Sequence, residues 1–131
     1  MTVLRRALQA FAAIWAGSGI ALIAVPRWLL VTGFDQPPYP DYTYVRVAGA
    51  MSLTLAMIAV MVSRREDAWW WSTAFAIATG LCATITGLHA LLGVPAEASS
   101  LLWWLFAGTS LALTVLFVIG LTRASQDNPI G

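Results

Sequence analysis

The chain has 131 residues, of which 60% are hydrophobic and 10% are charged, and its formal net charge is +1. About a quarter of the residues of an ordinary soluble domain are charged, so this composition predicts a protein that resides in a membrane. Nucleic-acid binding is not expected, because it requires clustered cations and the seven basic residues are spread along the chain.

Four uncharged runs are each long enough to cross the hydrocarbon core of a bilayer, about 30 Å, as an α-helix. Stretches such as LTLAMIAVMV and LALTVLFVIGL are apolar on every side, whereas the strands of a membrane barrel alternate between apolar and polar residues. The sequence therefore predicts an all-α fold, a single domain over residues 1–131. We expect an antiparallel, up-down-up-down four-helix bundle in the membrane, with helices at about 5–25, 45–63, 68–92 and 100–122.

The arginines predict how the bundle is oriented, because cytoplasmic loops carry an excess of positive charge. With the N-terminus inside, five of the seven arginines are cytoplasmic: Arg5, Arg6, Arg64, Arg65 and Arg123. Arg27 and Arg46 are then outside. We expect both termini in the cytoplasm and a multi-pass protein of the cell membrane, whose first helix is retained because no small-x-small cleavage site ends it.

The longest connection joins the first two predicted helices, and we call it the strap (residues 26–44). Residues 27–32 are expected to form a short helix on the membrane surface, which Gly33 ends. Pro37, Pro38 and Pro40 fix φ and remove backbone donors, so the following chain is expected to be extended and stiff. The strap is therefore predicted to be a rigid lid over the outer ends of the helices.

The candidate site lies at this outer level. His89, the only histidine, is about one turn from the end of the third predicted helix, and Arg46 enters the membrane from the same side. Asp41 is the expected ion-pair partner of Arg46, with Glu97 as the second choice. The whole expected cluster is Arg46, His89, Asp41, Asp35, Glu97, Tyr42 and Tyr44.

Several roles are open for this cluster. Arg46 fits a structural ion pair, an anchor at the interface, or a holder of a lipid headgroup or another anion. His89 fits a hydrogen-bonded core residue, a ligand-binding group, or a catalytic acid or base. No metal site is expected, because the chain has one histidine and one cysteine, and no cofactor is expected, because haem usually needs two axial ligands.

Small and hydroxyl-bearing residues predict how the helices pack, since helices in lipid associate through close backbone contact and hydrogen bonds. Ser72, Thr79, Cys82, Thr86 and His89 share one face of the third helix, which we expect to point into the bundle. Gly17 in the first helix, Gly80 and Gly87 in the third and Gly108 in the fourth are expected at contacts between helices.

Two classes of function fit this chain. The first is a small membrane protein without catalytic activity. It would be an accessory or scaffold subunit of a larger membrane complex or a homo-oligomer, or it would bind a lipid or lipophilic molecule beneath the outer strap. The alternative is a small membrane enzyme or a quinone- or isoprenoid-handling protein, in which His89 is the acid or base and Arg46 stabilises an anion.

The opening of the second predicted helix, YVRVAGA, resembles the small four-helix DoxX-like membrane proteins and, more distantly, small scaffold proteins of ergosterol biosynthesis. Arg46 followed three residues later by Gly49 carries this resemblance, together with a first span that ends at a proline. The resemblance implies a bacterial membrane protein of a kind that is sometimes associated with oxidoreductases. The YPDYTY stretch of the strap departs from that pattern.

Overall fold

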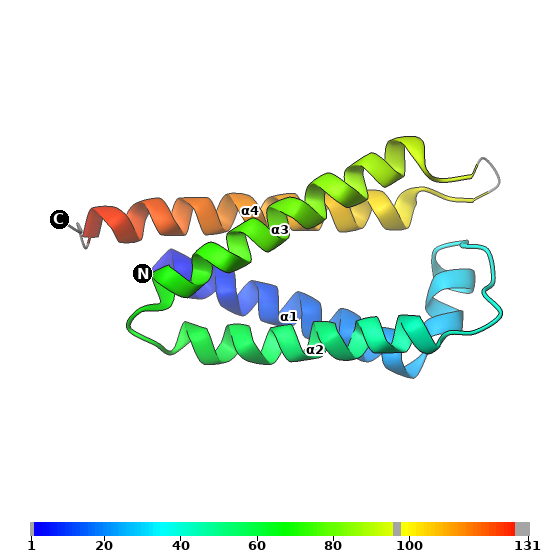
Figure 1. Ribbon diagram of the computed structural model, residues 1–131, viewed down its shortest axis with the longest axis horizontal. Helices are drawn as coiled ribbons and strands as arrows, with labels where there is room; N and C mark the ends of the chain where they lie inside the picture. The colour runs from blue at the N-terminus through cyan, green and yellow to red at the C-terminus, as the bar shows by residue number, and fades with distance from the viewer. Residues whose placement is uncertain (1, 96–97, 128–131) are drawn as a thin grey trace.

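The computed structural model describes residues 2–95 and 98–127, which form four long helices joined by short connections (Figure 1). The helices are α1 (Thr2–Ala24), α2 (Thr43–Ser63), α3 (Ala68–Leu92) and α4 (Leu101–Asp127), and a short π-helix, η1 (Trp28–Gly33), lies between α1 and α2. Each long helix is long and apolar enough to cross a membrane. The predicted all-α fold is therefore confirmed, and the short helix predicted at the start of the strap is present.

The four helices are arranged as two pairs. α1 packs mainly on α2, and α3 packs mainly on α4, while α1 and α4 make the main contact between the pairs. The pairs lie close together at the end of the bundle that holds the N-terminus and the turn at 64–67 (Figure 1). We call this end of the bundle the turn end. They diverge toward the opposite end, which holds the strap and the connection between α3 and α4 (Figure 1). We call this opposite end the strap end.

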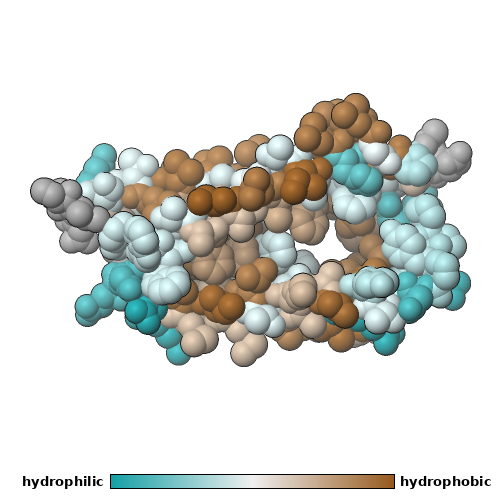
Figure 2. Space-filling model, in the orientation of Figure 1, coloured by the Kyte–Doolittle hydropathy of each residue, from teal (hydrophilic) through white to brown (hydrophobic). Residues whose placement is uncertain are grey.

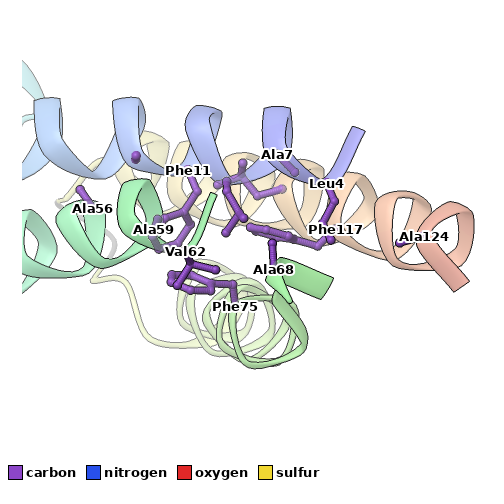
Figure 3. Packing of buried hydrophobic residues seen from close by; sticks show 13 residues of the cluster. Leu4, Ala7, Phe11, Ala56, Ala59, Val62, Ala68, Phe75, Phe117 and Ala124 are labelled. Carbon is purple, nitrogen blue, oxygen red and sulfur yellow. The ribbon is translucent and has the colours of Figure 1, made fainter. Parts of the chain in front are cut away.

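A close-packed core fills the turn end of the bundle (Figure 3). Phe11 of α1 lies at its centre, with ring centroids 5.0 Å from Phe75 of α3 and 6.3 Å from Phe117 of α4. Such aromatic pairs each contribute about 0.5–1.5 kcal/mol beyond the apolar area that they bury. Three of the four helices thus meet through large side chains that leave little space between them.

Two glycines let α1 and α2 approach closely toward the strap end. A Cβ atom on Gly19 would lie 2.6 Å from the carbonyl oxygen of Gly49, and one on Gly49 would lie 2.7 Å from the carbonyl oxygen of Gly19. Neither position has room for a side chain. This reciprocal contact holds the first pair together backbone to backbone, as is usual for helices in lipid.

The glycines predicted to lie at helix contacts do so only in part. Cβ atoms on Gly80 and Gly87 of α3 would lie 3.7 Å from Thr114 Cγ2 and 3.9 Å from Ala107 Cβ of α4, as expected, but the prediction is wrong for Gly17 and Gly108. Nothing lies within 4 Å of a Cβ atom built on Gly17 or Gly108. Gly120 is the close contact of α4 instead, where a Cβ atom would lie 2.9 Å from the Cα atom of Leu4. Four-residue spacing identifies small residues on one helix face, but it does not say which face meets a neighbour.

The helix boundaries differ from the predicted ones at three places. α1 begins at Thr2, three residues before the predicted start at 5. α2 begins at Thr43, two residues before the predicted start at 45, because Asp41 accepts hydrogen bonds from the first residue of the helix. α4 continues to Asp127, beyond the predicted end at 122, because Ala124 is buried against the core. The predicted bounds of α3 agree with the structure.

Candidate functional site

A cavity of about 570 Å³ separates the two helix pairs toward the strap end. Figure 2 shows this part of the molecule as a hollow between the two rows of helices. The residues that line it lie between Ile14 and Leu22 in α1, Leu29 and Tyr39 in the strap, Val45 and Ser52 in α2, and Leu102 and Ser110 in α4. None of these lining residues is charged, and most are aliphatic or aromatic.

The side chains explain why the bundle is filled at one end and hollow at the other. Phenylalanines from three helices fill the space at the turn end. Trp15 of α1 and Phe106 of α4 still meet, with ring centroids 5.8 Å apart, but the α1 and α2 walls beyond them carry small residues such as Gly17, Ala21, Ala48 and Ser52. The same four helices therefore produce a packed core and a cavity in succession.

The strap forms the roof of the cavity. Leu29 and Phe34 line it, and Leu30 is buried. The sequence predicted that Trp28, Leu29 and Leu30 would lie on the membrane surface. η1 instead turns Leu29 and Leu30 toward the cavity, whereas Trp28 is 61% exposed. Asp35, with φ of 53°, adopts the left-handed conformation that ends this turn, which aspartate tolerates better than most residues.

Gln36 fastens the roof to the opposite side of the molecule. Its side chain is buried, and Nε2 donates hydrogen bonds to the carbonyl oxygens of Ser99 at 2.7 Å and Phe34 at 3.1 Å. Ser99 lies in the connection between α3 and α4, so this one side chain links the two helix pairs across the strap end. Sequence reasoning missed Gln36, because a single amide next to three prolines carries no recognisable pattern.

Part of the predicted cluster comes together at the start of α2. Asp41, Tyr42 and Arg46 line a small open pocket of about 310 Å³, together with Pro40 and Thr43. Asp41 Oδ1 accepts hydrogen bonds from the backbone N–H of Thr43 at 2.9 Å and from its hydroxyl at 2.7 Å. These two bonds are the main reason that the pKa of Asp41 is lowered, and the charge of Arg46 is the smallest cause.

Asp41 thus stabilises the turn that leads into α2, whose N-cap is Tyr42, and within the described residues it forms no ion pair with Arg46. The described ion pair of the chain lies at the turn end, where Arg65 Nε donates to Asp67 Oδ1 at 2.7 Å. The pKa of Asp67 is lowered chiefly by the hydrogen bond from Arg65, and Trp71 Nε1 adds a second donor.

His89 lies apart from this group. Its ring packs edge to face on Trp103 of α4, with centroids 4.3 Å apart and an interplanar angle of 71°. Trp103 lines the cavity and His89 does not, so His89 packs against a residue of the cavity wall. His89 does not line the small pocket that holds Arg46, and the helices that carry the two residues, α3 and α2, diverge toward the strap end (Figure 1).

The remaining members of the predicted cluster are not gathered into one site. Tyr44 is 86% exposed, and Asp35 is also exposed. Glu97, the second expected partner of Arg46, lies outside the described residues. The structure therefore unites Asp41, Tyr42 and Arg46, and it places His89 in a separate contact with an aromatic wall.

The predicted polar stripe on α3 does point into the bundle. Ser72 and Thr79 are fully buried, and Thr114 Oγ1 of α4 donates to Thr79 Oγ1 at 2.9 Å. This contact and the His89–Trp103 contact lie along the same α3–α4 interface. The stripe stabilises one helix pair and, in the described part of the chain, adds no residue to the cavity.

Metal binding finds no support in the described residues, where no three His, Cys, Asp or Glu side chains form a group that could hold an ion. Among known proteins, no family model, curated protein or solved structure matches the chain.

Proposed function

We propose that this chain is an integral membrane protein that holds a lipophilic molecule in the cavity beneath its strap. The observation that carries the proposal is the cavity itself, which lies beneath the strap and whose lining, in the described part of the chain, is mostly apolar and has no charged residue. Its volume of about 570 Å³ lies within the range of small-molecule sites, roughly 300–1,000 Å³. Sites of this kind are mostly apolar and carry a few polar groups that orient the ligand.

The cavity is partly open to its surroundings, so a molecule of the membrane can enter it. The cavity is lined mostly by apolar groups, and a lipophile fills such a space better than water does.

The orientation that we propose places the termini in the cytoplasm and the strap outside, in the cell membrane. Arg64, Arg65 and Arg123 belong to the turn end and are exposed, in keeping with the excess of positive charge on cytoplasmic loops. Trp28 at the strap end is 61% exposed and Trp70 at the turn end is 64% exposed. Tryptophans at both ends suit the two interfaces of a bilayer.

Purification in native-lipid particles, followed by mass spectrometry of the extracted molecules, tests the proposal. Gly17→Phe places an aromatic ring in the cavity, and Gly108→Phe is its control, because both positions have open space around Cβ but only Gly17 lines the cavity. We expect the original chain and Gly108→Phe to retain a lipophile through delipidating washes, and Gly17→Phe to lose it. Equal retention by all three, or a protein partner in place of a lipophile, would contradict the proposal.

A further inference from the structure

The hydroxyl groups inside the helices fall into two sets. Between residues 18 and 122 of the four long helices, eleven of the fourteen serines and threonines form a side-chain hydrogen bond within the chain, usually to a carbonyl one turn earlier. This is the usual way in which a hydroxyl is satisfied in a membrane helix. Among the described residues of this range, the side chains without such a bond are those of Ser18, Thr109 and Ser110.

All three of these residues line the cavity. Ser18 lies on the α1 wall, and Thr109 and Ser110 lie on the α4 wall. Thus the hydroxyls that lack a hydrogen bond within the chain are the ones at the cavity, and this holds on two helices that are far apart in the sequence. It indicates that these hydroxyls are kept available for something that enters the cavity.

Ser110 is the strongest of the three, because only 3% of its surface is exposed. No fully enclosed side-chain polar atom of the described residues lacks a partner, so the Ser110 hydroxyl opens to the cavity and is not sealed inside protein. A buried hydroxyl that gains no hydrogen bond costs about 1–3 kcal/mol. The group is therefore expected to bind an oxygen atom that the occupant supplies.

We infer that the occupant is an electrically neutral lipophile with a carbonyl or hydroxyl oxygen, which accepts a hydrogen bond from Ser110 in the membrane interior. This inference rests on the proposed function. Thr109 and Ser18 are further hydroxyls on the same cavity, and they bind a second polar atom of the ligand or a water beside it.

The neutrality of the ligand follows from the charges around it. Among the described residues, none that lines the cavity is charged. Arg46 belongs to the separate small pocket of Asp41 and Tyr42, and Ser110 lies well inside α4. An unpaired charge in such surroundings is strongly disfavoured, whereas an uncharged oxygen needs only one hydrogen bond. A fatty acid anion and an anionic lipid headgroup therefore do not fit this position.

Competition among three probes of equal chain length tests the inference. Tritiated hexadecanol is bound to the detergent-solubilised protein and displaced with unlabelled hexadecanol, hexadecane or hexadecanoate at about pH 8, where a carboxylate is ionised. We expect hexadecanol to compete about three- to tenfold better than hexadecane, which corresponds to one net hydrogen bond. Hexadecanoate is expected to compete least.

Two double variants show whether the cavity hydroxyls cause this preference. Thr109→Val with Ser110→Ala removes both hydroxyls of the α4 wall and is expected to abolish the advantage of hexadecanol over hexadecane. Thr84→Val with Thr122→Val is the control, because both hydroxyls are exposed and bonded to their own helices, and it is expected to keep the advantage. Binding of hexadecanol and hexadecane with equal strength, or an unchanged preference in the first variant, would overturn the inference and leave the proposed function standing. If no probe binds, the proposed function itself fails.

Discussion

Gly19 of α1 and Gly49 of α2 face each other so closely that a Cβ atom on either would lie within 2.7 Å of the carbonyl oxygen of the other. Gly49 is the glycine that follows Arg46 in the YVRVAGA stretch, so a packing role accounts for this part of the pattern without any ligand. The contact also bears on the cavity, because Ser52 of the cavity wall lies one turn beyond it on α2.

Alanine at Gly19 or Gly49 is expected to destabilise the α1–α2 pair by about 1–3 kcal/mol, because the added methyl group meets backbone, which has little freedom to move. Gly17→Ala is the matched control on the same helix and is expected to be neutral or slightly stabilising, since its Cβ meets open space. Unfolding in detergent, followed by circular dichroism, measures the difference. Equal stability of Gly49→Ala and Gly17→Ala would show that the pair is not packed in this way.

The hydroxyl pair Thr79–Thr114 links α3 to α4 and predicts a measurable coupling. Thr→Val at each position, alone and together, forms a double-mutant cycle that isolates the bond between the two side chains. Interhelical hydrogen bonds of this kind contribute about 0.6 kcal/mol on average in membrane proteins and up to about 1.7 kcal/mol. A coupling energy in that range is expected from unfolding free energies, and strictly additive effects would contradict the contact.

Asp41 provides a prediction about pH. Its pKa is lowered in the folded protein, so the stability that its carboxylate gives to the start of α2 is present above the ordinary pKa of 3.8 and is lost as the pH falls through the lowered value. Amide exchange at the start of α2 is therefore expected to speed up in acid, and Asp41→Asn is expected to remove this pH dependence.

The cause of the lowered pKa of Asp41 distinguishes a hydrogen-bonded turn at the start of α2 from an ion pair with Arg46. Thr43→Val removes the hydroxyl that is the largest cause, and it is expected to raise the pKa of Asp41 toward its usual range. Arg46→Gln removes the smallest cause and is expected to change the pKa of Asp41 little. Titration of the labelled carboxyl carbon by NMR measures both. A larger effect from Arg46→Gln than from Thr43→Val would restore the ion pair that the sequence suggested.

Gln36→Leu tests whether the strap is fastened as the structure indicates. Loss of the hydrogen bonds to Ser99 and Phe34 is expected to speed amide exchange in the strap by about three- to tenfold, while exchange in the core at the turn end stays unchanged. Gln126→Leu, at an exposed position in the last turn of α4, is the control. Unchanged exchange in the strap would mean that the roof is held by other contacts.

Much of the secondary structure could be predicted from the sequence, because an unbroken apolar run leaves the helix as its main solution in lipid. The bounds of α3 and the inward direction of its hydroxyl stripe followed from this pattern. The divergence of the two helix pairs did not, since it depends on where large and small side chains face one another across the bundle. Phe11 and Gly17 lie six positions apart on α1, yet one fills the core and the other lines the cavity.

The candidate site was predictable only in part for the same reason. The sequence places Arg46 and His89 at a similar depth in the membrane, but an equal depth does not bring two side chains into contact when their helices diverge. Gln36, which bonds the strap to Ser99, and the hydroxyls of Ser18, Thr109 and Ser110 have no recognisable sequence pattern. The resemblance to DoxX-like proteins, the place in the cell membrane and a role beside a larger complex stay predictions.

The most direct test of the proposed cavity site uses the paired residues Trp103 and Trp104. They are neighbours in α4, but Trp103 lines the cavity, whereas Trp104 is 46% exposed and does not line it. Fluorine NMR of protein labelled with 5-fluorotryptophan resolves both, once each resonance has been assigned by a single Trp→Phe variant. On titration with hexadecanol in detergent, we expect a saturable shift of the Trp103 resonance and none of the Trp104 resonance. Equal, unsaturable shifts of both resonances would contradict a site in the cavity.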